Sequence, residues 1–233
     1  MAVRSGFLSK YFYFAMSLLF AVVVVVGFSQ TINQNLFHAA VPRPTLLWFH
    51  GAAFASWVVF VILQASLVRL RKVSVHRLLG WFGAGLATVM VVLGFTTAVV
   101  MTRFDTHQLH EAGVESFMAI PFWDMIAFGS LVALAIYWRK KPELHKRLML
   151  IATCCLMDAP FGRFDYLFNN NLYFVCLDVL ILLGVGRDLV VDRRVHKVYL
   201  YALPVIVAGQ AFTMYLDLGN PGWWQGITHA LIG

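Results

Sequence analysis

The chain has 233 residues, of which 61% are hydrophobic and only 12% are charged, and its formal net charge is +7. About a quarter of the residues in a soluble globular domain are charged, so this composition excludes an ordinary soluble protein. Several apolar runs reach about 20 residues, the length that a helix needs to cross a bilayer. No polar stretch is long enough for a soluble domain, and we expect residues 1–233 to form a single transmembrane helical domain.

The apolar runs predict an all-α integral membrane bundle of seven transmembrane helices with up-and-down topology. The first run follows a short basic segment but is longer than the apolar part of a signal peptide. It also lacks a clear small-x-small cleavage site, so we expect it to be retained. The seven predicted helices cover residues 10–29, 45–68, 78–101, 116–138, 148–166, 172–186 and 198–216.

The distribution of basic residues predicts the orientation of the bundle. With loops on alternate sides, fifteen of the eighteen Lys and Arg residues fall on one side, and only Arg43, Arg103 and Arg163 fall on the other. The positive-inside rule makes the basic side cytoplasmic. We therefore expect a multi-pass protein of the cell's inner (plasma) membrane, with the N-terminus cytoplasmic and the C-terminus outside. The basic loops favour contact with membrane lipids rather than with nucleic acid.

The second predicted helix carries polar residues along one face. His50, Trp57 and Gln64 recur every seven residues, which places them on the same side of the helix. His50 lies near the outer end and is a candidate ligand for a metal or a cofactor.

Three basic hinges, at residues 69–77, 139–149 and 187–197, each deliver a histidine to the start of an apolar helix. These histidines are His76, His145 and His196. His76 lies above small residues on its helical face, which leaves room for a neighbouring helix or a flat macrocycle. Two imidazoles between apolar walls, with cations nearby, suit a b-type haem with two histidine ligands. The candidate cations for its propionates are Arg77, Lys146 and Arg147.

A second interpretation of these histidines stays open. Each would be a residue at the membrane interface that caps exposed backbone groups or contacts lipid headgroups. This interpretation is favoured for His196, whereas His76 and His145 fit both interpretations equally well.

Acidic residues define a second candidate site in the outer half of the bundle. Carboxylates are costly within a membrane and face a cavity or a partner. Together with His50, three of them would form a pocket for Zn or another divalent metal in a membrane-embedded hydrolase. These three residues are Asp124, Asp158 and Asp178. The alternative is a structural ion pair between Arg163 and one of them, next to the helix break expected at Pro160.

Two further sets of residues are weaker candidates. His107, His110 and Glu111 would bind Zn or Cu if they were helical, but we expect them in a solvated outer loop. The three cysteines contain no CxxC motif, so neither a disulfide framework nor a structural zinc site is expected.

Two segments carry a resemblance to known proteins: HRLLGWFGAGLATVMVVLG (residues 76–94) and PELHKRLMLIAT (residues 142–153). They resemble an uncharacterised family of small bacterial polytopic membrane proteins, whose arrangement is distantly similar to the transmembrane ascorbate-type cytochromes b. The resemblance implies that His76 and His145 pair around one haem b. His50 would match a ligand of a second haem, but the fourth predicted helix offers no histidine as its partner.

The sequence leaves three hypotheses of function. The first is a membrane b-type haem protein that transfers electrons between a quinone or small reductant and a partner. The second is a metal-dependent hydrolase with the outer pocket of histidine and aspartates. The third is a non-catalytic subunit that packs against partner subunits in a larger membrane complex.

Overall fold

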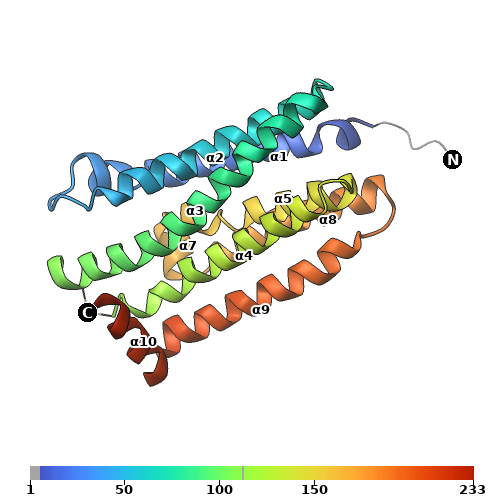
Figure 1. The fold of residues 1–233 in the computed structure, drawn as a ribbon. Helices are drawn as coiled ribbons and strands as arrows, with labels where there is room; N and C mark the ends of the chain where they lie inside the picture. Colours follow the sequence, from blue (N-terminus) through green and yellow to red (C-terminus); the bar gives the residue numbers. More distant parts are fainter. Residues whose placement is uncertain (1–5, 112) are drawn as a thin grey trace.

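A computed structural model describes residues 6–111 and 113–233, and the regular elements among these residues are all helices (Figure 1). Five helices are long and apolar enough to cross a membrane. They are α1 (Phe7–Ser29), α2 (Leu46–Arg69), α3 (Val73–Gln108), α4 (Ala119–Tyr137) and α9 (Lys197–Gly219). Their outward faces carry exposed apolar side chains such as Val25, Val59 and Leu78, as contact with lipid requires. The protein is therefore an all-helical membrane bundle.

Four predicted helices agree with α1, α2, α4 and α9 to within three residues at each end. The third predicted helix, at residues 78–101, corresponds to α3, which extends further in both directions because the polar segments on either side of the apolar run are helical too. His107 consequently lies in the last turn of α3 rather than in a loop, while His110 and Glu111 follow the helix.

The fifth predicted helix, at residues 148–166, is not continuous. α5 (Pro142–Cys154) is followed by the short helices α6 (Asp158–Phe161) and α7 (Asp165–Asn169). Pro160 has no N–H group, and its ring would clash with the carbonyl of residue 156 in a continuous helix. The helical ladder therefore ends before this point. α8 (Tyr173–Val191) corresponds to the sixth predicted helix and continues beyond it into the basic hinge.

α5 lies at the centre of the bundle rather than at its surface. Ile151, Ala152 and Cys154 have no exposed surface, and α5 packs against α1, α4, α8 and α9. The turns between α2 and α3, α4 and α5, and α8 and α9 gather at one end of the bundle (Figure 1). This end contains the three basic hinges.

The opposite end is closed by shorter elements, among them η1 (Asn33–Phe37), η2 (Ser116–Met118) and α10 (Gly222–Ile232). The indole N–H of Trp224 donates to the Ser116 carbonyl over 3.2 Å. Arg43 forms an ion pair with Asp105 at 2.7 Å, which joins the loop before α2 to the end of α3. These contacts hold the connections of this end against the long helices.

Candidate functional site

The structure brings His76 and His145 together at the basic end of the bundle. Their ring centroids are 6.2 Å apart and their planes are at 81° to each other. His76 belongs to the first turn of α3 and His145 to the first turn of α5. Both side chains are half-buried. Equivalent positions in two helical hairpins thus place two imidazoles face to edge.

Each imidazole lies against the backbone of the preceding helix. The Nδ1 atom of His145 is 2.9 Å from the carbonyl oxygen of Ala135 in α4. A carbonyl only accepts, so this nitrogen carries the proton and Nε2 keeps its lone pair for a ligand. The His76 ring lies beside the Gln64 carbonyl of α2, and the Gln64 side-chain amide donates to the His76 carbonyl over 3.3 Å. Both histidines thus lie against the preceding helix, but a ring nitrogen is hydrogen-bonded to its backbone only in His145.

The separation of the rings suits a shared iron atom. An imidazole nitrogen lies about 1 Å from its ring centre and about 2 Å from a metal that it ligates. Two imidazoles on opposite sides of one metal ion therefore have ring centres about 6 Å apart. Among the described residues no group of three or more His, Cys, Asp or Glu side chains could hold a metal ion. Two protein ligands are too few for a zinc site without other ligands. They are enough to complete the coordination of an iron atom that is already bound by a porphyrin.

The space beside the histidines is partly filled. Phe60 of α2 occupies the position that a Cβ atom would take at Gly83, whereas nothing lies within 4 Å of a Cβ atom at Gly80. The small residues next to His76 thus serve helix packing at Gly83 and leave open space at Gly80. The Nδ1 atom of His76 and the Oε1 atom of Gln64 are both buried without a hydrogen-bond partner.

The three predicted propionate partners differ in their surroundings. Arg77 is exposed, and Lys146 forms an ion pair with Glu143 at 2.7 Å. Arg147 is 1% exposed, and its guanidinium group already donates to three carboxylates. Arg147 is therefore committed to a structural network, and Arg77 and Lys146 are the remaining candidates for contact with propionates.

The network around Arg147 joins α5 to α8. Both side-chain oxygens of Asp188 accept from Arg147 at 2.7 Å, and Arg187 donates to Asp188 at 2.9 Å and to Asp192 at 2.6 Å. Asp188 has no exposed surface. The sequence analysis did not identify these carboxylates. The sequence did contain a signal for this network: Asp188 and Asp192 lie four positions apart within the basic hinge.

Burial and hydrogen bonds shift the pKa values of several ionisable groups at this end, among them Glu143 and His196. Burial alone would raise the pKa of Glu143, but hydrogen bonds from Lys146 and Arg147 lower it to about 2. Burial lowers the pKa of His196, and the Nδ1 atom of His196 accepts from the backbone N–H of Val198 over 3.2 Å. His196 therefore caps α9, which confirms the interpretation favoured for this histidine.

The predicted outer metal pocket does not assemble. The carboxyl groups of Asp124 and Asp158 are both buried and lie next to each other. Asp178 instead accepts from the side-chain amide of Gln210 over 3.1 Å, and His50 stacks on Phe54 at 4.1 Å.

The predicted ion pair of Arg163 is likewise not found among the described residues. The guanidinium carbon of Arg163 lies 5.2 Å from the centre of the Phe28 ring, in a cation–π contact between the region of α6 and α1. Arg163 interacts with Asp158 only at longer range. Near the break after α5, Arg163 therefore contacts an aromatic ring instead of forming an ion pair.

The fold and the site define a helical membrane protein with a histidine pair at its basic end. Comparison of the chain with protein-family models, characterised proteins and solved structures found no match. The case for a function therefore depends on the geometry of the histidine pair.

Proposed function

We propose that this protein is an integral membrane b-type haem protein that transfers electrons between a quinone or small reductant and a partner. The observation that carries the proposal is the 6.2 Å separation of the His76 and His145 rings. These histidines would hold the haem iron, and Arg77 and Lys146 would bind the propionates. The bound haem would supply one-electron redox chemistry.

The residues of the chain would prepare this site in two ways. The hydrogen bond between His145 and Ala135 fixes the ring orientation and leaves Nε2 as the ligand atom. The packing of α5 within the bundle excludes water from one side of the site, because its residues beyond His145 are almost all buried.

The proposal includes a seven-pass topology in the plasma membrane, with the basic end cytoplasmic. Five helices meet the length and composition of a span. The segment from α5 to α7 would be a sixth, broken span, and α8 would be the seventh. Non-helical backbone at membrane depth is tolerated where protein surrounds it, and Asp158 and Pro160 of α6 are indeed buried.

An absorption spectrum of the purified protein, oxidised and then reduced, tests the proposal. We expect a Soret band and reduced α and β bands in the wild type. His76→Ala and His145→Ala should each lose the low-spin spectrum, whereas the matched control His196→Ala should keep it. Wild-type protein without haem that can be extracted into acidified solvent would contradict the proposal.

The same purification separates the other two hypotheses. A metal-dependent hydrolase would carry stoichiometric metal that Asp124→Asn removes, and a non-catalytic subunit would copurify with partner subunits in mild detergent. The separate surroundings of His50, Asp124 and Asp178 give the hydrolase no assembled ligand set.

A further inference from the structure

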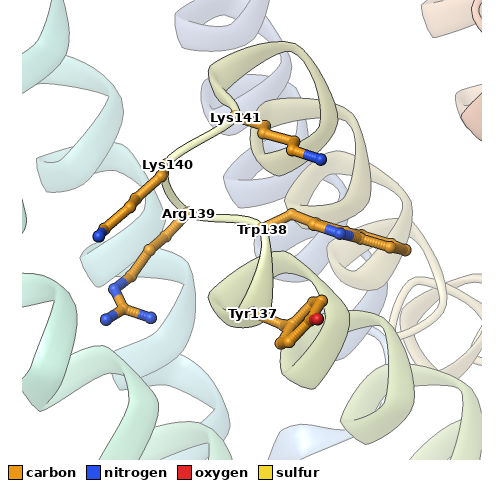
Figure 2. A pocket seen from close by; sticks show the side chains of 5 residues that line it. All are labelled: Tyr137, Trp138, Arg139, Lys140 and Lys141. Carbon is orange, nitrogen blue, oxygen red and sulfur yellow. The ribbon is translucent and has the colours of Figure 1, made fainter.

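The hinge between α4 and α5 surrounds a surface hollow of about 450 Å³. Five consecutive residues line the hollow, and Figure 2 shows their side chains around the hinge: Tyr137, Trp138, Arg139, Lys140 and Lys141. In that view Arg139 and Lys140 extend to one side of the backbone, and Trp138 and Lys141 extend to the other. The residues that line the hollow thus include two aromatic rings and three cations, and two of the cations, Arg139 and Lys140, lie on the same side.

The cations of the hollow have no carboxylate partner among the described residues. The ion pairs of this end of the bundle are formed by Lys146, Arg147 and Arg187 instead. Arg139 donates one hydrogen bond to the Ile136 carbonyl over 3.2 Å, and its guanidinium carbon lies 5.3 Å from the centre of the Trp81 ring. The remaining donors of the three cations are free to bind an anion.

The N-terminus of α5 offers few donors to an anion. Pro142 has no N–H group, and the N–H groups of Leu144 and His145 both donate to the Lys141 carbonyl over 3.0 Å. Glu143 also places a carboxylate in this turn. The hollow and its unpaired cations are therefore the features that favour a compact anionic group.

We propose that the hollow binds the phosphate group of an anionic phospholipid from the leaflet at the basic end. Aromatic rings at the membrane interface suit the junction of headgroup and acyl chains. Tyr137 is 75% exposed and Trp81 is 63% exposed, so both offer an apolar surface beside the cations. Clusters of basic residues at the membrane surface attract anionic headgroups, and the hollow gathers such residues at one hinge.

The lipid site lies next to the histidine pair. The carbonyl of Lys141 accepts from the backbone N–H of His145 over 3.0 Å, so the hinge carries the turn that positions this histidine. Lipid bound at the hinge would therefore stabilise the first turn of α5. The lipid proposal depends only on the membrane bundle and holds whether or not the protein binds haem.

Lipid binding to purified protein, followed by native mass spectrometry, tests the proposal. Arg139→Gln/Lys140→Gln is compared with Arg194→Gln/Lys197→Gln, which removes the same charge from exposed positions at the hinge between α8 and α9. We expect the hollow variant to bind phosphatidylglycerol at least about ten-fold more weakly than the wild type, because it loses two cations that would contact the phosphate directly. The control should change binding by less than about two-fold.

Three results would overturn the proposal. Equal weakening in both variants would show that the whole basic end attracts anionic lipid without a specific site. Equal binding of phosphatidylcholine would show that the site does not select lipids by their net charge. Displacement of phosphatidylglycerol by inorganic phosphate at equal concentration would identify a free-phosphate site. If the hollow variant fails to fold, the wild-type protein is cross-linked to a photoactivatable phosphatidylglycerol and the cross-linked residues are identified. Cross-links within residues 137–141 support the proposal, and cross-links confined to other hinges contradict it.

Discussion

The buried pair of Arg147 and Asp188 makes a quantitative prediction about stability. Arg147 makes five hydrogen bonds, and the two to Asp188 are both 2.7 Å long. Asp188 has no exposed surface, whereas the other two carboxylates that accept from Arg147, those of Glu143 and Asp192, are 61% and 32% exposed. Asp188→Asn therefore removes the one fully buried carboxylate of Arg147, and breaking a buried pair costs about 3–5 kcal/mol. We therefore expect Asp188→Asn to lower the free energy of unfolding by about 3 kcal/mol or more. On the scale for chains of this size, this lowers the melting temperature by roughly 6–20 °C.

Thermal unfolding of detergent-purified protein measures this effect, with Arg194→Gln as an exposed control that should change the melting temperature little. The double variant Arg147→Met/Asp188→Leu removes both charges and fills the same space with apolar groups. It should be clearly more stable than either single variant. A loss below about 1 kcal/mol in Asp188→Asn, or additive losses in the double variant, would refute the reasoning.

Three further predictions concern other parts of the bundle. Gly209→Val should destabilise the protein by about 1–3 kcal/mol in thermal melts, because a Cβ atom there would overlap the Trp123 ring. Gly226→Val is the control, since nothing lies within 4 Å of a Cβ atom at Gly226. Equal melting temperatures of the two variants would contradict the prediction. Folding lowers the pKa of Glu143 from 4.5 to about 2. Its contribution to stability is therefore present above the unfolded pKa and is lost as the pH falls through the folded pKa. Glu143→Gln should make the melting temperature depend less on pH over this range, and an unchanged dependence would contradict the contact. Asp124→Asn replaces one of two adjacent buried carboxyl groups with a neutral amide of similar shape, so we expect the free energy of unfolding to stay within about 1 kcal/mol of wild type in thermal melts. A larger loss would mean that Asp124 makes a contact that an amide does not replace.

The histidine pair could be foreseen because its determinants are local. His76 and His145 each follow a short basic hinge and begin an apolar helix, so two hairpins of similar design place them at the same end. Their meeting needed one further condition, the packing of α3 and α5 against the same helix, α4, which sequence spacing does not specify. The capping role of His196 was also local, since it depends on the N–H group two residues later.

The carboxylate contacts could not be foreseen because they depend on how helices are rotated against each other. Asp124 and Asp178 both lie in apolar runs and look equivalent in the sequence, yet one meets Asp158 and the other meets Gln210. The rotation of each helix depends on side-chain packing along its whole length. The break near Pro160 was foreseen from the chemistry of proline, whereas the early end of α5 at Cys154 was not.

The ion pair and the histidine pair are connected through α5. His145 and Arg147 are two residues apart, which is about 200° around a helix, so they point to opposite sides. One side faces His76 on α3, and the other faces Asp188 on α8. The pair with Asp188 fixes the rotation of α5 and with it the direction of the His145 ring. If His145 is a ligand, Asp188→Asn should shift the reduced spectrum at temperatures below unfolding, and the apolar double variant should restore it. A spectrum unchanged until the protein unfolds would mean that α5 is held in position by its apolar contacts alone.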